Sequence, residues 1–160
     1  MNLGAGVHLT YCSNIHPGES WAEVRANLGR HVLAVRDRLA VAGRFGVGLR
    51  LSAQAASELS ADDALAEFRD FLARERLYVF TVNGFPYGAF HGARVKEAVY
   101  LPDWRDPSRL HYTNRLANLL AALLPDEPGM EGSVSTVPGA YKPALNGPDD
   151  IAAIAEYLLQ

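Results

Sequence analysis

The residues best suited to chemistry follow the predicted strands of this chain, at the point where each strand ends. They are Asn14 and His16 after residues 7–12, Arg50 in residues 45–52, Asn83 at the end of residues 77–83, and Thr136 in residues 132–137. Imidazole can transfer a proton, guanidinium can hold a carboxylate or phosphate, and amide and hydroxyl groups can hydrogen-bond a polar ligand. The pattern predicts a small-molecule site at the strand ends.

A long connection after the third predicted strand adds more candidates. Residues 84–105 separate a buried strand from the next helix signal, although such connections ordinarily need about 2–6 residues. The segment carries aromatic side chains that favour burial, so we expect an ordered, ligand-facing loop. Phe85 and Tyr87 could cover a ligand or only anchor the loop. His91 and Lys96 could act as acid, base or anion ligand, or could simply be solvated.

Each of the other candidates also has a structural interpretation. His16 could hydrogen-bond the loop backbone, and Arg50 could pair with an acidic neighbour instead of a ligand. Asn83 precedes a glycine and could serve only to turn the chain. We expect Trp104 to anchor the long loop and Cys12 to be a small buried residue. No metal ligands or catalytic residues are assigned.

Alternating strand and helix signals predict an α/β fold of four parallel βα units. Ser20 and Glu23 form a capping box before a helix over residues 21–39, Ser60 is expected to cap another helix, and Asp106-Pro107 and Pro148 open two more. An open doubly wound sheet and half of a (β/α)₈ barrel both fit. The first strand lacks a glycine-rich dinucleotide fingerprint, and the polar strand ends favour the barrel.

Composition narrows the class of protein. A chain of 160 residues with a formal net charge of -3 and no basic cluster is expected to form one domain, residues 1–160, that does not bind nucleic acid. The lone cysteine suits a reducing compartment, and neither a signal peptide nor a membrane-spanning stretch is visible. We therefore expect a cytoplasmic protein.

Five stretches together resemble one known family. They are HLTYCSNIHPGESWAEV from His8, FGVGLRLSAQAA from Phe45, YVFTVNGFPYGAFHG from Tyr78, VKEAVYLPDWRDPSRLHYT from Val95 and GSVSTVPGAYKP from Gly132. They resemble the metabolite traffic protein EboE family, which is similar to the xylose isomerase-like TIM barrels. The resemblance implies the N-terminal half of such a barrel, an incomplete domain whose remaining strands lie beyond Gln160.

The resemblance also implies a function, which is the traffic or processing of a small secondary metabolite. Proteins of the same gene cluster, including a membrane prenyltransferase-like protein, are implied as partners. Related barrels include sugar phosphate isomerases and epimerases, whose divalent metal would here be held by the missing half. The alternatives are therefore an isomerase or epimerase and a non-catalytic metabolite-binding protein. An endonuclease IV-like nuclease is disfavoured by the acidic charge balance. An uncovered half-barrel is expected to self-associate.

Overall fold

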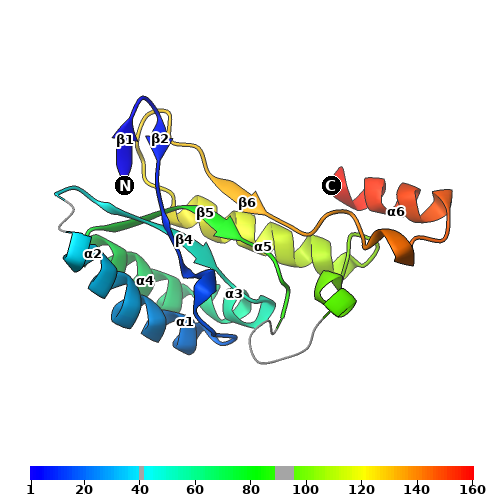
Figure 1. The fold of residues 1–160 in the computed structure, drawn as a ribbon, viewed down its shortest axis with the longest axis horizontal. Coiled ribbons are helices and arrows are strands. Elements are labelled where there is room, and N and C mark those ends of the chain that lie inside the picture. The colour runs from blue at the N-terminus through cyan, green and yellow to red at the C-terminus, as the bar shows by residue number, and fades with distance from the viewer. Residues whose placement is uncertain (40–41, 89–95) are drawn as a thin grey trace.

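A parallel sheet forms the centre of the fold, and the computed structural model describes residues 1–39, 42–88 and 96–160 (Figure 1). Helices and short turns connect its strands. In chain order the elements are β1 (Asn2–Gly4), β2 (Val7–His8), β3 (Tyr11–Cys12), η1 (Ser13–Ile15), α1 (Trp21–Asn27), η2 (Leu28–Val32), α2 (Leu33–Leu39), β4 (Phe45–Arg50), α3 (Ala53–Leu59), α4 (Asp62–Arg74), β5 (Leu77–Asn83), η3 (Lys96–Tyr100), α5 (Pro107–Leu123), β6 (Ser133–Ser135), η4 (Lys142–Ala144) and α6 (Pro148–Leu158).

The four central strands are parallel and lie side by side in chain order, β3-β4-β5-β6. Gly48 pairs with Cys12 on one side and with Thr81 on the other, and Asn83 pairs with Ser135. Helices connect successive strands, as parallel connections require. The predicted α/β class and the parallel sheet are confirmed.

The helices cover one face of this sheet. Val47 and Leu49 of β4 are fully buried in one cluster with residues of α1, α3, α4 and α5. The intervening Gly46 and Gly48 face the other way, and a methyl group on Gly46 would lie 2.5 Å from the carbonyl oxygen of Leu9. Small residues on this second face therefore let the N-terminal segment approach the sheet.

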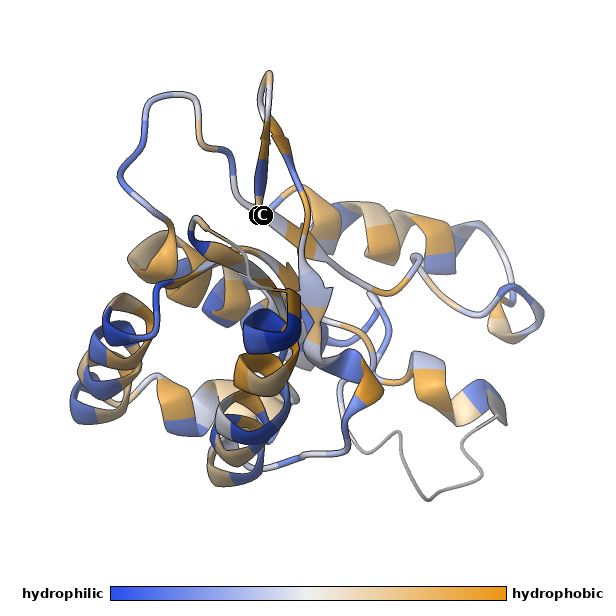
Figure 2. Cartoon of the chain, turned by 60° about the vertical axis from the view of Figure 1, so that its left-hand side comes forward, coloured by the Kyte–Doolittle hydropathy of each residue, from blue (hydrophilic) through white to orange (hydrophobic). Residues whose placement is uncertain are grey.

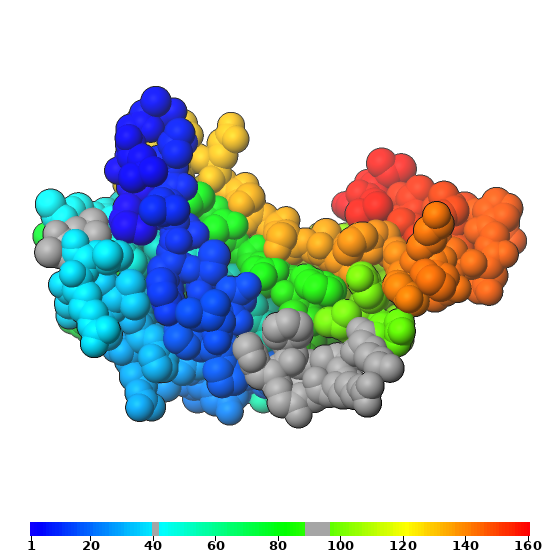
Figure 3. Space-filling model, in the orientation of Figure 1, coloured from blue at the N-terminus to red at the C-terminus, as the bar shows by residue number. Residues whose placement is uncertain are grey.

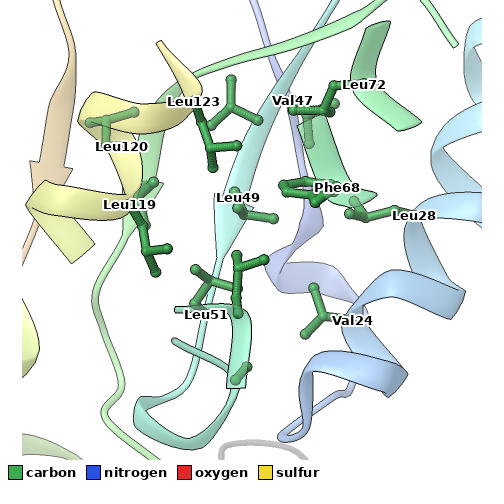
Figure 4. Packing of buried hydrophobic residues seen from close by; sticks show 14 of the residues in the cluster. Val24, Leu28, Val47, Leu49, Leu51, Phe68, Leu72, Leu119, Leu120 and Leu123 are labelled. Carbon is green, nitrogen blue, oxygen red and sulfur yellow. The ribbon is translucent and has the colours of Figure 1, made fainter. Parts of the chain in front are cut away.

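Buried apolar side chains fill the layer between the sheet and the helices (Figure 4). Val24 and Leu28 come from the first helical segment, Phe68 from α4 and Leu119 from α5, and they meet Leu49 at the centre. Apolar and hydrophilic bands alternate along the helices (Figure 2), as expected of elements that bury one face. Burial of this face holds the helices on the sheet.

Capping residues mark the starts of α1 and α5. Ser20 accepts a hydrogen bond from the Glu23 amide and the Glu23 side chain reaches back, so the capping box is confirmed. Asp106 caps α5, which begins at Pro107 as predicted. The prediction for Ser60 was wrong: α4 begins at Asp62, and the Ser60 hydroxyl instead donates to the Ala56 carbonyl, ending α3. A serine can bond to the preceding turn as readily as to a following one.

The first predicted strand, residues 7–12, is broken in the structure. Val7 belongs to a short antiparallel hairpin of β1 and β2, and only Tyr11 and Cys12 join the parallel sheet. The expected apolar face is not buried, because Val7 is 55% exposed and Leu9 is 51% exposed. Cys12 is also exposed, which corrects the expectation of a buried thiol.

The face opposite α1, α3, α4 and α5 is hollowed. Figure 3 shows the surface dipping between the N-terminal hairpin and α6, with β5 and β6 below. Ser133 and Ser135 are exposed on this face. We call it the open face of the sheet. Separately, within the part of the chain that the structure describes, no helix has the length and apolar character needed to span a bilayer.

Candidate functional site

The predicted polar strand ends lie along a single edge of the sheet. Asn14 follows β3, Arg50 and Asn83 are the last residues of β4 and β5, and Thr136 follows β6. Arg50 is in register with Asn83, and Asn83 is in register with Ser135. These residues therefore share the edge at which the parallel strands end, which we call the carboxyl edge.

Arg50 is buried at this edge and is held by the protein itself. Its Nη1 atom donates to the Gly18 carbonyl at 2.7 Å and to the Glu19 carboxylate at 3.0 Å. Its Nη2 atom donates to the Gly88 carbonyl at 2.7 Å. Arg50 therefore ties the loop before α1 to the loop after β5, and its acidic partner comes from this chain.

His16 lies beside β3 in a stack of rings. Its Nε2 atom shares a 2.8 Å hydrogen bond with the Tyr11 hydroxyl. The imidazole ring stacks on that of His31, with 4.1 Å between ring centres and 12° between planes. Asn14 is exposed one turn earlier in η1. These contacts fix the ring of His16 at one side of the carboxyl edge.

Asn83 connects the turn after β5 to the neighbouring strand. Its Oδ1 atom accepts from the Phe85 amide at 3.0 Å, which confirms the predicted turn, and from the Ser135 hydroxyl at 2.8 Å. One pair earlier, the Ser133 hydroxyl donates to Thr81 at 2.9 Å. We call Thr81, Asn83, Ser133 and Ser135 the polar row. It runs along the open face toward the carboxyl edge.

Aromatic residues of the long connection pack at the same edge. Phe85 lies against Tyr100, and Tyr87 meets the ring of Tyr112 edge-on at 5.0 Å between ring centres. Trp104 is 4% exposed and its indole N–H donates to the Val137 carbonyl, so the predicted anchor is confirmed. Phe85 and Tyr87 are each half-buried and keep part of their surface in solvent.

Two further candidates, His91 and Lys96, come from the long connection. His91 lies outside the residues that the structure describes. Lys96 is the first residue of η3.

Arg109, which the sequence did not single out, is fully buried near the same edge. Its Nε atom donates to the Pro102 carbonyl at 2.8 Å and its Nη1 atom to the Gly84 carbonyl at 3.0 Å. These two carbonyls belong to opposite ends of the long connection. One signal could have revealed Arg109: it lies three residues before Tyr112, on the apolar stripe of its helix.

Burial shapes the electrostatics around Arg109. Desolvation lowers the pKa of Arg109, although a guanidinium stays cationic at neutral pH. Desolvation also raises the pKa of Tyr112, so its hydroxyl stays neutral and donates to the Leu51 carbonyl. The guanidinium carbon lies 5.5 Å from the ring centre of Tyr87 and 5.4 Å from that of Tyr112. The two rings stabilise the buried cation.

An open hollow of about 740 Å³ adjoins this arginine. Tyr87 and Pro102 line it, and both contact Arg109. Three of its charged side chains pair with one another, since Arg105 lies 2.7 Å from Asp103 and 3.2 Å from Asp150. The fourth, Asp106, accepts a hydrogen bond from the Ser108 amide. The hollow could admit a small ligand to the carboxyl side of the sheet.

A second hollow, of about 540 Å³, lies at the opposite, amino end of the strands. Arg44, Arg69 and Arg76 line it beside Tyr78. Arg44 pairs with Glu127 and lies over the Tyr78 ring, and Arg76 donates to the Ala42 carbonyl. Arginines here also complement the carboxyl end of α4, so structural contacts explain most of this cluster.

Residues 1–39, 42–88 and 96–160 contain no set of side chains that forms a metal site. No group of three or more His, Cys, Asp and Glu side chains there is placed to hold a metal ion.

The chain was compared with known proteins in three ways. No family model, curated protein or solved structure matches it.

Proposed function

We propose that this chain binds a small polar metabolite on the open face of its sheet, at the carboxyl edge. The resemblance to the EboE family supplies the biological expectation, which is the traffic or processing of such a metabolite. On this proposal the open face lines the interior of a (β/α)₈ barrel to which the chain contributes four units. Barrels of this kind bind their ligands at the carboxyl ends of the strands.

The polar row is the observation that carries the proposal. Among the described residues, the Nδ2 atom of Asn83 has no hydrogen-bond partner, while its Oδ1 atom is fixed by Phe85 and Ser135. The orientation of the amide is therefore set in advance, with two N–H donors left for a ligand. Pre-ordered donors bind more tightly because less freedom is lost on association.

The chain is proposed to bind and orient the metabolite. An isomerase or epimerase that uses a divalent metal would need ligands beyond the described residues, so no metal-dependent step is assigned to this chain. Arg50 and Arg109 keep the loops of the edge in place through their bonds to loop carbonyls. Those loops form the rim through which a metabolite would enter.

Ligand capture tests this proposal. The full chain is mixed with a dialysable small-molecule extract, recovered by rapid gel filtration, and its bound compounds are identified by mass spectrometry. Asn83→Leu removes the free amide donors and is expected to lose the captured compound. Asn118→Leu, an exposed site on α5, is the matched control and should retain it. Equal capture by both variants, or none by the unaltered chain, contradicts the proposal.

A further inference from the structure

Arg109 is a buried cation without a counter-ion in the described part of the chain. Its residue exposure is 0%, and none of the ion pairs among the described residues includes it. The neighbouring carboxylate of Asp103 is engaged by Arg105 at 2.7 Å. A buried charge without a partner is unfavourable. An anionic group bound beside Arg109 would supply the missing partner.

One nitrogen of the same guanidinium also lacks a hydrogen bond. Nε and Nη1 are bonded to the carbonyls of Pro102 and Gly84, but the buried Nη2 atom has no partner among the described residues. Arg50 differs, because both of its Nη atoms donate to the protein. Buried N–H groups are nearly always paired in native proteins, so the exception requires an explanation.

A second unpaired polar atom belongs to Thr136, which follows β6 at the carboxyl edge of the sheet. The hydroxyl oxygen of Thr136 is buried and has no hydrogen-bond partner in the described part of the chain. Gly84 links the two atoms: its amide donates to the carbonyl of Ser135, the residue before Thr136, and its carbonyl accepts from Arg109. Gly84 is therefore bonded both to Arg109 and to the residue that precedes Thr136.

The hollow of the carboxyl side lies next to Arg109. Tyr87 and Pro102 form the wall that separates Arg109 from the hollow of about 740 Å³. Tyr87 is half-buried and lies in the loop after β5, not in a helix or strand. A bound anion would reach the guanidinium from the hollow only if the ring of Tyr87 shifted, and such a shift would unfold no helix or strand.

We infer that Arg109 and Thr136 form an oxyanion subsite that takes a carboxylate or phosphate group. The anion accepts hydrogen bonds from Nη2 of Arg109 and from the Thr136 hydroxyl, and it neutralises the buried charge. The inference rests on the proposed function only in assigning this group to the metabolite. Binding of a simple anion to these two residues does not depend on the proposed function.

Titration of the full chain with inorganic phosphate, followed by ³¹P NMR and by thermal unfolding, tests the subsite. Sodium acetate is the second arm, and sodium chloride at equal ionic strength is the reference. We expect a saturable rise in the unfolding temperature with one of the two oxyanions and none with chloride. The stronger arm identifies the ligand group as phosphate or carboxylate. The absence of a saturable effect with both oxyanions overturns the inference.

Three variants locate the bound anion. Arg109→Gln is expected to weaken binding by about ten- to a hundredfold, since it removes a charge-assisted hydrogen bond. Thr136→Val, which keeps the shape of the side chain, should weaken it by about three- to tenfold. Arg69→Gln removes an exposed arginine from the amino-end hollow and should bind as the unaltered chain does.

Thr136→Val keeps the test decisive if Arg109→Gln does not fold. Without an anion, this variant should be as stable as the unaltered chain or more stable, because an unpaired buried hydroxyl is removed. A merely structural threonine would not combine weaker anion binding with unchanged or greater stability. Unchanged affinity in Thr136→Val, or a loss in Arg69→Gln instead, overturns the inference. Neither result would alter the outcome of metabolite capture with Asn83→Leu.

Discussion

The two buried arginines at the carboxyl edge differ in how many of their N–H groups the protein uses. Both Nη atoms of Arg50 donate hydrogen bonds, to loop carbonyls and to Glu19, so Arg50 holds the loops of the rim in place. Arg109 holds two carbonyls but keeps Nη2 unpaired. Position in the sequence alone favours Arg50 as the ligand-binding residue, because it ends a strand. The hydrogen bonds make Arg109 the better candidate.

Asp103 is a single residue that should stabilise the fold in a pH-dependent way. Burial by itself raises the pKa of Asp103, but hydrogen bonds from the amide and guanidinium of Arg105 outweigh burial and hold the pKa below its ordinary value. The folded protein therefore gains stability above about pH 4, where the unfolded carboxyl is ionised, and loses it as the pH falls through the lower folded value.

Asp103→Asn tests this dependence. At pH 7 we expect a loss of about 1–3 kcal/mol in the free energy of unfolding, measured with urea. The difference from the unaltered chain should shrink as the pH falls below about 4. Asp149→Asn, an exposed site in the first turn of α6, should change stability by less than about 0.5 kcal/mol. A loss from Asp103→Asn that is the same at every pH would contradict this explanation.

At the scale of elements, Gly84 allows the end of β5, the end of β6 and α5 to meet. A methyl group on Gly84 would lie 2.6 Å from the Ser135 carbonyl oxygen and 2.7 Å from Cδ1 of Leu116. The first contact is with backbone, which cannot move aside as a side-chain end can. Only glycine fits at this position, because Ser135 belongs to β6 and Leu116 belongs to α5, and both would clash with a larger residue.

Gly84→Ala is therefore expected to lower stability by about 1–3 kcal/mol, because the strands must separate to admit the methyl group. Gly88→Ala is the matched control four residues on, where an added methyl group meets nothing within 4 Å. Thermal unfolding of both variants provides the measurement. Equal stability of the two variants would show that the close approach at Gly84 is unimportant.

Elements with strong local signals were predictable from the sequence. The strand 77–83 is rich in β-branched and aromatic residues, and the capping residues of α1 and α5 mark their starts; all three are confirmed. The hairpin β1–β2 was missed because its alternating residues 7–12 look like a single strand. Thr136 was predicted from its place at a strand end. Arg109 was missed because its importance arises from contacts distant in the sequence.

In the whole molecule, the arrangement of layers determines which surface is open to a ligand. Helices cover one face of a four-stranded parallel sheet, and the open face carries the polar row under a hollowed surface (Figure 3). Ordinary α/β sheets are covered on both faces. The open face is therefore expected either to line a larger barrel or to be covered by another molecule. Self-association through this face stays a prediction.

The central claim is that a metabolite binds at the carboxyl edge of the sheet. Amide chemical-shift mapping of the ¹⁵N-labelled full chain, with and without a dialysable small-molecule extract, tests it most directly. The account predicts that the largest shift changes fall on the amides of Asn83, Ser135 and Thr136. Changes confined to the amino end of the strands, around Arg76 and Tyr78, would contradict it.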